Sequence, residues 1–316
     1  MSKATPTLPT IRQLQYFVAI VDDGGISRAA ARLLIAQPAI SEQISGLELQ
    51  LGVKLLTRSS RGTKPTDAGI VLYRQASSIL RQMEQLSGMV AVADREPTGL
   101  VGIGIISSLA ARLSDSLFSA CRERYPKIRL RIVEGTSVDI REQVMAGRID
   151  LGLAFGDGEA PGLIRQLLFR QKLFVAGAPS LLAPEGGTGM SISDLASHAL
   201  VMPSAPNAIR ATLDRSFANL GMFPNVVAET TSLHGLMAAV RAGLGLTVLP
   251  LGEPLPSADP DGLVRKELMP SLYLSATLLT SALTPPSSAA MAIQQLLADI
   301  VRMRVTSGAW VGSEPA

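Results

Sequence analysis

The segment from residue 37 to residue 48 carries polar side chains that can read nucleic acid. Amide and hydroxyl groups hydrogen-bond base edges and phosphates, and here they are supplied by Gln37, Ser41, Gln43 and Ser45. Apolar residues recur at helical spacing on the opposite face, as burial requires, at Ile40, Ile44 and Leu47. Pro38 falls in the first turn, where its missing N–H is not needed. The pattern predicts a helix that enters the major groove of DNA.

A shorter helix is expected immediately before this one, ending near residue 34. Ser27 stands where its hydroxyl can cap that helix, and Arg28 beside it adds a positive charge. Small residues from Ala29 to Ala31 let a second helix approach closely. Together the two segments predict a helix-turn-helix whose second helix recognises bases. The alternative is an ordinary helical hairpin with a polar outer face.

Residues 53–66 follow with a cluster of cations that can hold phosphates. Two short extended pieces flank a polar turn, which is typical of a β-wing. Between Glu48 and Asp67 the chain has no acidic residue, and its basic residues there are Lys54, Arg58, Arg61 and Lys64. A charge run alone usually indicates only a solvated face. Beside a recognition helix it favours phosphate contacts, which we expect from Arg58, Arg61 and Lys64.

The segment from Thr10 to Thr66 resembles the winged helix-turn-helix of LysR-type transcriptional regulators. The matching residues are Leu14-x-x-Phe17, Ser27-x-Ala29-Ala30-x-x-Leu33, Gln37-Pro38-Ala39-Ile40-Ser41-x-Gln43-Ile44, Leu47-Glu48-x-x-Leu51-Gly52 and Thr66-x-Ala68-Gly69. The family layout extends over essentially the whole chain and implies double-stranded promoter DNA as a partner. One position departs from it, because many members carry arginine after the recognition-helix serine and this chain has Glu42. A phosphate contact is therefore not transferred to that position.

The composition agrees with a DNA-binding protein of the cytoplasm. Of the net charge of +3, the whole positive excess lies in residues 1–95, which hold 11 basic and 7 acidic residues. No apolar run is long enough to cross a membrane, and residues 1–12 lack the apolar stretch of a signal peptide. Cys121, the single cysteine, is expected to be a small buried hydrophobe rather than a redox sensor.

Residues from 67 to about 93 have helical character and carry a heptad seam. The seam residues alternate steps of four and three, at Leu72, Ala76, Ile79, Met83, Leu86 and Val90. A long helix cannot cover such a seam alone, so we expect a partner helix from a second chain. The alternative is a seam that packs onto its own domain. The resemblance assigns dimerisation to this helix and implies a homotetramer built by contacts between effector lobes.

After Pro97 the chain alternates between strand and helix patterns, which predicts parallel sheets covered by helices. The fold class is therefore α/β, with an N-terminal winged helix-turn-helix over residues 1–66. A linker helix over residues 67–96 and a two-lobed α/β effector domain over residues 97–304 follow. The resemblance implies that this effector domain is similar to periplasmic solute-binding proteins, with the ligand between lobes joined by two crossovers.

The lobe boundaries follow from the family layout, which sends the last segment back to the first lobe. Lobe I is expected to comprise residues 97–161 and 269–304, and lobe II residues 162–268.

Trp310 lies in a tail, residues 305–316, that is rich in glycine, serine and proline. We expect this tail to be loosely ordered.

Polar residues follow several predicted strands, at the carboxyl ends where open α/β sheets bind their ligands. Hydroxyl groups beside the free backbone N–H groups of a helix start suit a carboxylate or another small anion. The candidate effector-binding residues, which the resemblance also implies, are Ser107, Ser108, Thr136, Pro203, Ser204 and Asn207. Arg210 can add a charge. Each of these residues can equally be a helix cap with no ligand role.

These observations predict a ligand-responsive transcription regulator and weigh against two other classes. The two-lobed cleft alone would also fit a solute-binding protein, but residues 10–95 and the missing signal peptide favour the regulator. An enzyme is not expected, because the sequence has neither a nucleophile elbow nor glycines in the order that a dinucleotide needs. The run from Pro203 to Arg210 is similar to the nitrogen-assimilation branch of the family. No metal is expected, since no His, Cys or acidic cluster has metal-ligand spacing. No cofactor and no membrane partner are expected either.

Overall fold

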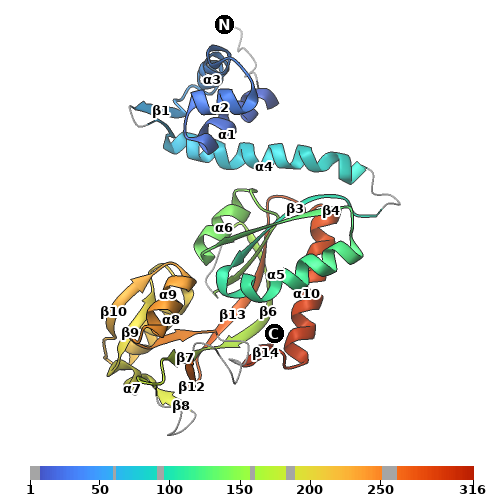
Figure 1. Ribbon diagram of the computed structural model, residues 1–316. Coiled ribbons are helices and arrows are strands. Elements are labelled where there is room, and N and C mark those ends of the chain that lie inside the picture. The colour runs from blue at the N-terminus through green and yellow to red at the C-terminus, as the bar shows by residue number, and fades with distance from the viewer. Residues whose placement is uncertain (1–7, 60–61, 91–95, 157–160, 183–188, 251–261) are drawn as a thin grey trace. The chain divides into compact units, whose positions relative to one another are not determined.

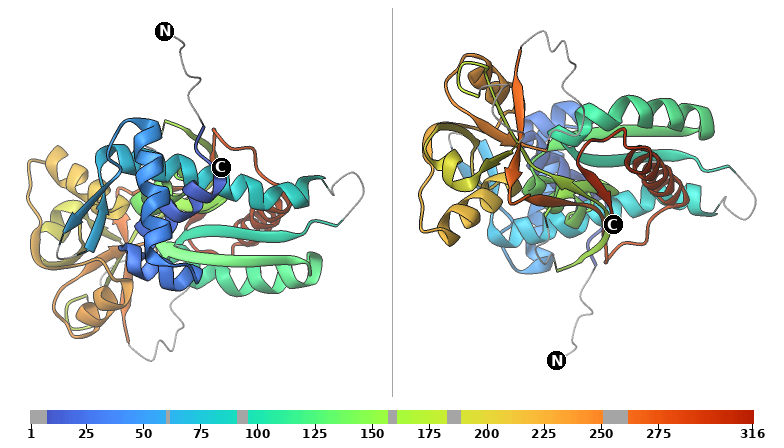
Figure 2. Two further views of the ribbon diagram at one scale, coloured as in Figure 1. Left: turned by 90° about the horizontal axis from the view of Figure 1, so that it is seen from above. Right: turned by 90° about the horizontal axis from the view of Figure 1, so that it is seen from below.

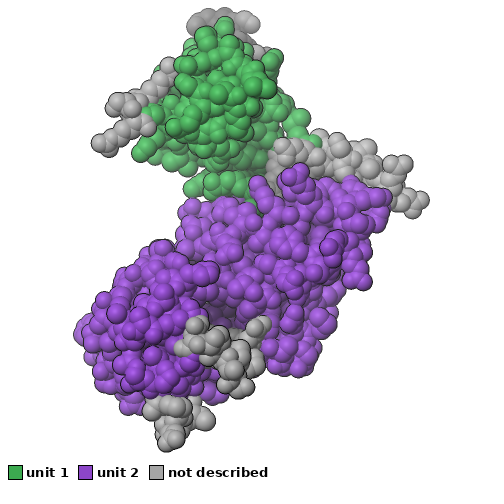
Figure 3. Space-filling model, viewed as in Figure 1, with its two compact units in different colours: residues 1–95, 145–149 green, residues 96–144, 150–316 purple. Residues whose placement is uncertain are grey.

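The computed structural model describes residues 8–59, 62–90, 96–156, 161–182, 189–250 and 262–316. The chain divides into two compact units (Figure 3), and each is described by itself. One comprises Met1–Arg95 with Met145–Ile149, and the other comprises Glu96–Val144 with Asp150–Ala316. None of the described helices combines the length and the apolar character that crossing a bilayer requires.

The first unit consists of three short helices, a two-stranded wing and a long fourth helix (Figure 1). In chain order these are α1 (Ile11–Asp23), α2 (Ile26–Leu33), α3 (Gln37–Leu51), β1 (Leu56–Ser59), β2 (Gly62–Pro65) and α4 (Asp67–Val90). A capping box starts α1, in which the Gln13 side chain accepts from the Thr10 N–H at 2.8 Å and Thr10 Oγ1 accepts from the Gln13 N–H. Gly24 ends this helix at a φ of 64°, in the left-handed region that favours glycine.

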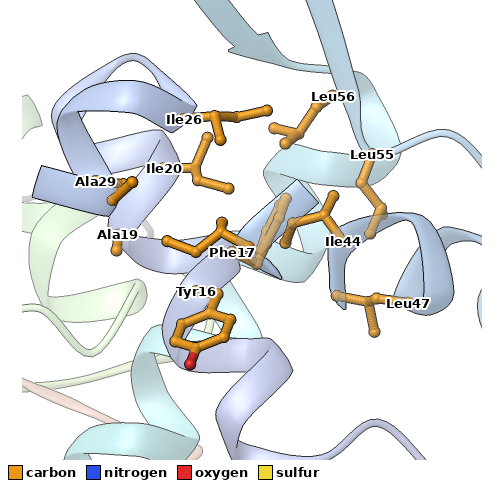
Figure 4. Close-up of a cluster of buried hydrophobic side chains, with 12 residues drawn as sticks. Tyr16, Phe17, Ala19, Ile20, Ile26, Ala29, Ile44, Leu47, Leu55 and Leu56 are labelled. Atoms are coloured by element: carbon orange, nitrogen blue, oxygen red, sulfur yellow. The ribbon is translucent and has the colours of Figure 1, made fainter. Parts of the chain in front are cut away.

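A buried apolar cluster holds the first three helices together (Figure 4). Phe17 and Ile20 of α1 and Leu47 of α3 are fully shielded from solvent, and Ala29 of α2 lies among them. The predicted apolar face of α3 is confirmed, since Ile44 and its neighbours on that face are buried. Burial of this face turns the polar residues of the helix outward.

Ser27 does not cap α2 as the sequence predicted. The helix begins earlier, at Ile26, so Ser27 lies inside the first turn, and Gly25 occupies the N-cap without a side-chain hydrogen bond. Ile26 is 6% exposed, and its place in the core explains the earlier start. The Ser27 hydroxyl instead donates to Gln37 Oε1 at 3.1 Å, which joins the first turn of α2 to the start of α3.

The linker helix α4 buries the first part of its apolar seam within its own unit. Leu72 packs against the core cluster and Ala76 is fully buried, because α4 lies against α1. Ile79 and Met83 are 41% and 39% exposed, while the side chains of Leu86 and Val90 lie outside the described set. The alternative of packing onto the same domain therefore holds for the first two residues. Pairing between chains stays a prediction for the others.

Lobe I of the second unit is a six-stranded sheet with helices packed on it (Figures 1 and 2). Its order is β14-β6-β13-β5-β3-β4. The strands are β3 (Gly99–Ile106), β4 (Ile128–Gly135), β5 (Leu151–Phe155), β6 (Leu163–Lys172), β13 (Tyr273–Ser281) and β14 (Ser313–Pro315). The helices are α5 (Ser107–Arg124), α6 (Ser137–Met145) and α10 (Ser288–Thr306). The parallel pairing of β3 with β4 and β5 confirms the predicted strand–helix alternation.

Lobe II contains the elements between the two crossovers. Its four-stranded sheet has the order β11-β7-β12-β8, with β7 (Phe174–Gly177), β8 (Gly189–Ser191), β11 (Thr247–Leu249) and β12 (Val264–Met269). Beside it, β9 (Ala199–Pro203) pairs in parallel with β10 (Asn225–Thr230). Its helices are α7 (Ile192–Ala196), α8 (Ala208–Asn219) and α9 (Leu233–Arg241). Three elements here were not predicted from the sequence: β8 and α7 are too short to show a clear hydrophobic period, and charged residues interrupt the period of β12.

The first crossover lies later in the chain than the predicted boundary at residue 162. β6 pairs with β13 from Leu163 opposite Ser281 to Lys172 opposite Tyr273, so the whole strand belongs to the lobe I sheet. The chain enters lobe II only after Lys172. Hydrophobic periodicity identifies a strand but not the sheet in which it pairs, which explains the difference.

The C-terminal tail is ordered, contrary to the expectation for residues 305–316. Helix α10 continues to Thr306, and β14 adds to the edge of β6 with Ser313 opposite Gln171. Trp310 is 1% exposed, and its ring centroid lies 5.3 Å from that of Phe169. Glycine and serine in the tail indicated flexibility, but burial of one large aromatic ring outweighs their conformational freedom.

Candidate nucleic-acid interface and effector pocket

The outward face of α3 presents the polar residues that were predicted to read DNA. Gln37 is exposed at the helix start, and Ser41 and Gln43 are partly exposed. Pro38 occupies the first turn, as predicted. Because the Ser27 hydroxyl engages Gln37 Oε1, the amide N–H groups of Gln37 remain as donors. Glu42, also exposed, places one negative charge on this face.

The wing forms as predicted and is fastened to the turn between α1 and α2. β1 and β2 are antiparallel, and the Thr63 N–H donates to the Gly24 carbonyl oxygen at 3.2 Å. Arg28, which is exposed on α2, donates through Nε to the Asp23 carbonyl oxygen at the end of α1. Lys64 is exposed on β2. The side chain of Arg58 and the whole of Arg61 lie outside the described residues.

Glu48 and Lys54 form an ion pair that the sequence analysis missed. Glu48 is 9% exposed; its carboxylate accepts from Lys54 Nζ at 2.6 Å and from the Leu55 N–H at 2.9 Å. Burial by itself raises the pKa of the Glu48 carboxyl, but hydrogen bonds from Lys54, Leu55 and Leu56 together hold the pKa below its usual value. Lys54 therefore neutralises a buried carboxylate. The signal was a glutamate directly after Leu47, on the apolar side of α3.

The second unit has a pocket of about 440 Å³ between its two lobes. Lobe I supplies Ile106, Ser107, Ser108, Glu134, Gly135, Thr136, Ser137, Asp139 and Phe155. Lobe II supplies Pro203, Asn207, Ala208, Ile209, Thr230, Thr231, Ser232, Leu233, Leu236 and Leu249. Five of the six predicted effector residues thus line one pocket. The exception is Ser204, whose backbone N–H donates to the Thr230 carbonyl oxygen at 3.0 Å.

Four helices begin at this pocket, and three of them have a side-chain cap. Thr136 caps α6, accepting from the Asp139 N–H at 3.2 Å and donating to Asp139 Oδ2 at 2.7 Å. Asn207 caps α8 by accepting from the Ile209 N–H at 2.8 Å, and Ser232 caps α9. Helix α5 has no side-chain cap, because Ser107 and Ser108 lie inside its first turn. Its first N–H groups are therefore open to an acceptor.

The ionisable side chains among the described lining residues are acidic. They are Glu134 and Asp139, and hydrogen bonds from the Thr136 hydroxyl and N–H lower the pKa of the Asp139 carboxyl. Arg210, a candidate source of positive charge, does not line the pocket. Its guanidinium instead pairs with Asp214 at 2.8 Å and Glu229 at 2.5 Å. Hydroxyl and backbone N–H groups, rather than a cation, are what the described lining offers to a negative ligand.

The sequence analysis missed the contribution of the loop between β10 and α9. Thr230, Thr231 and Ser232 line the pocket, and Leu233 and Leu236 add apolar surface behind them. The signal was present, because hydroxyl-bearing residues follow a strand and precede a helix here, as they do at Ser107 and Thr136. The described residues contain no group of three or more His, Cys, Asp and Glu side chains that could hold a metal ion.

Comparison with known families assigns both units. Residues 11–70 match the family described as "Bacterial regulatory helix-turn-helix protein, lysR family", and residues 94–302 match the family "LysR substrate binding domain". The chain is 33% identical to the nitrogen assimilation regulatory protein nac of Escherichia coli K12, over 92% of this chain and 94% of that protein. It is 32% identical to the transcriptional regulator BenM of Acinetobacter baylyi, over 76% of this chain and 80% of BenM.

Solved structures agree with this assignment. A full-length OxyR variant from Pseudomonas aeruginosa has a TM-score of 0.72 at 20% identity, covering 94% of this chain and 96% of OxyR. Full-length BenM has a TM-score of 0.54 at 25% identity, covering 96% and 99% of the two chains. The helix-turn-helix and the two-lobed domain define a LysR-type, ligand-responsive transcriptional regulator. The chain belongs to the LysR family, which is a family of regulators and not of enzymes.

Proposed function

We propose that this chain regulates promoters as an oligomer, with α3 in the major groove and a small carboxylate-bearing effector between its lobes. The observation that carries the proposal is the outward polar face of α3 beside a wing, in a chain whose second unit has a pocket lined by both lobes. No catalytic step is proposed. The domain division follows the sequence analysis, except at the first crossover and the C-terminal tail.

The proposed DNA contacts fall into two groups. Base edges are read from α3 by Gln37, Ser41 and Gln43, with Pro38 setting the entry of the helix and Ser27 orienting Gln37. Phosphates are held by Arg28 near the α1–α2 turn and by wing cations, of which Lys64 is exposed. Arg58 and Arg61 are proposed from the sequence alone. A solved structure of full-length CbnR, 21% identical, includes its target DNA and supports the DNA-bound role of this fold.

The proposed effector contacts centre on the start of α5. Its first turn lacks a side-chain cap, and Ser107 and Ser108, which form that turn, both line the pocket. Thr136 and Asn207 line the same pocket but already cap their own helices, so we assign them a supporting role. Pro203 contributes shape. Ser204 is proposed only through its backbone, which positions the Pro203 loop.

Base readout is tested by Gln43→Ala, because an amide side chain that pairs with adenine contributes about 1–3 kcal/mol of discrimination. Gel retardation on single-base variants of the chain's own upstream region should show relaxed preference at one position. Glu42→Ala is the matched control on the same face, because it introduces no group that reads bases, and we expect it to keep the parent's base preference. Unchanged selectivity of Gln43→Ala at every position would refute the assignment.

The oligomer is proposed to form through Ile79 and Met83 of α4, with lobe contacts building a tetramer. Both side chains are exposed in one chain, and burial of the remaining two-fifths of each against a partner would contribute roughly 0.6–1.2 kcal/mol. Ile79→Asp combined with Met83→Lys should abolish specific operator binding while the lobes stay folded. Sedimentation that shows an unaltered oligomer for this double variant would count against the seam.

The effector site is tested by a thermal-shift screen of small carboxylates, since a ligand that binds only the folded state raises the melting temperature. Ser108→Ala should remove the shift given by any ligand found. Ser197→Ala is the control, because that serine lies outside the pocket. A ligand that stabilises Ser108→Ala as strongly as the parent would place the site elsewhere.

A further inference from the structure

The two crossovers between the lobes lie side by side. The chain passes from β6 into β7 at Phe174 and returns from β12 into β13 at Tyr273. Lys172 and Tyr273 are partners in the β6–β13 ladder, and the Leu173 N–H donates to the Leu272 carbonyl oxygen at 2.8 Å. We call residues 172–174 and 270–273 the hinge, because any change in lobe arrangement must pass through them.

The last residues of the chain bind both sides of this hinge. Residues 310–315, called the strap below, include β14, which pairs with β6 just before the crossover. The Lys172 N–H donates to the Gly312 carbonyl oxygen at 2.8 Å. On the other side of the hinge, the Tyr273 hydroxyl donates to Glu314 Oε1 at 2.7 Å. The strap therefore connects the two crossing segments to each other.

The strap also contacts the first residue of β7 in lobe II. Gly312 has a φ of 72°, and a Cβ atom added there would lie 2.7 Å from the Phe174 ring. The glycine backbone thus packs directly against an aromatic ring of β7. Both the left-handed conformation and the close approach require glycine at this position.

The other end of the strap is anchored in lobe I. The buried Trp310 ring stacks beneath the Arg112 guanidinium, whose Cζ lies 4.1 Å from the ring centroid. The side chain of Gln171, fully buried, donates to the Val311 carbonyl oxygen at 3.0 Å. Detaching the strap would expose a large apolar ring and take an acceptor from a buried amide, and both changes are unfavourable.

We propose that the strap is a conformational device that holds the lobes in the arrangement described here. Its contacts with Tyr273 and Phe174 depend on how the hinge residues lie, so another lobe arrangement must break or remake them. A ligand that favours such an arrangement has to supply the difference in free energy. This regulatory consequence rests on the proposed effector response, whereas the hold on the hinge does not. The strap follows residue 302, where the match to the substrate-binding family ends.

The hold is tested without any ligand, by hydrogen exchange of the full-length protein. Gly312→Ala forces a Cβ into the Phe174 ring and should speed exchange of hinge amides about tenfold or more. Gly221→Ala is the matched control, because Gly221 also has a left-handed φ, of 65°, but has nothing within 4 Å of an added Cβ. Alanine at 221 therefore introduces the same backbone strain as alanine at 312, without a clash and away from the strap. We expect hinge exchange in the control to match the parent.

Lobe arrangement is measured on the same variants by the distance between spin labels at Glu123→Cys and Arg215→Cys, with labelled chains diluted into unlabelled ones. A chain ending at Ser307, which lacks the strap, should show a broadened or shifted distribution. Tyr273→Phe removes only the hydrogen bond to Glu314 and should show a smaller change in the same direction. If the shortened chain does not fold, Gly312→Ala and Tyr273→Phe decide the question.

Emission from Trp310, the chain's single tryptophan, reports whether the strap is attached. Faster hinge exchange together with altered lobe distances supports the proposal. If hinge exchange and lobe distances match the parent in the folded variants, the strap is only a docked tail and the proposal is overturned. Because no ligand is added, this failure is distinct from failure of the thermal-shift screen, which bears on the effector site.

Discussion

The DNA-binding unit and the effector lobes differ in how far apart along the chain their contacting residues lie. In the first unit, α1, α2 and α3 are consecutive, and the wing is one hairpin. In lobe I, β6 lies between β13 and β14, which come from the far end of the chain. Local patterns therefore specify the first unit almost completely. In the lobes they specify the elements but not their partners.

The largest expected effect concerns Trp310, which packs on lobe I from the far end of the chain. Trp310→Ala should destabilise the lobes by about 3–5 kcal/mol, because it empties a fully buried aromatic site between Phe169 and Arg112. The DNA-binding unit should be unaffected. Thermal unfolding followed by circular dichroism, with hydrogen exchange to separate the units, measures both. Trp310→Phe, which keeps a ring, should lose less, and a loss confined to the tail amides would contradict this account.

A smaller effect tests a contact in the first unit that local patterns missed, the ion pair of Glu48 with Lys54. Glu48→Ala leaves the N–H groups of Leu55 and Leu56 without their acceptor and should cost about 1–3 kcal/mol. Lys54→Ala is the control and should cost less, since the Lys54 side chain is 80% exposed. Hydrogen exchange of α3 and wing amides is the measurement. Equal losses in the two variants would assign the effect to the ion pair instead.

The same site predicts a dependence on pH. The folded-state pKa of Glu48 is lowered, so its stabilising contribution is fully present above the carboxyl's unfolded pKa. That contribution is lost as the pH falls through the lowered folded-state value. Glu48→Ala should therefore be less sensitive to acid than the parent in the same exchange experiment.

The smallest effect distinguishes two roles of Thr136 in the pocket, as the cap of α6 and as a direct contact of the effector. Thr136→Val removes the cap of α6 and should cost about 1 kcal/mol, since the hydroxyl is engaged with Asp139. Thr136→Ser keeps the hydroxyl and should retain the cap. Exchange of the first α6 amides distinguishes the two. If Thr136→Val lost effector response without loosening α6, Thr136 would be a direct ligand contact.

Much of the candidate site followed from the sequence because its signals are local. The polar face of α3 and the serines after β3 each sit within one turn of the element that positions them. The roles of particular residues did not follow. Ser27 does not cap α2, because Ile26 is buried in the core and the helix starts there. Arg210 does not line the pocket, because its guanidinium forms ion pairs with Asp214 and Glu229. Both outcomes depend on neighbours that the pattern does not specify.

The sequence by itself determined the family, the order of the main elements and the residue types at the ends of the strands. Period, capping chemistry and turn residues act over a few positions, and the chain displays them directly. The tertiary structure decided the pairing of β6 with β13, the pocket contribution of Thr230 to Leu236, and the docking of the C-terminal strand. These features depend on which surfaces meet, and burial of side chains such as Trp310 fixes that only once the whole lobe has formed.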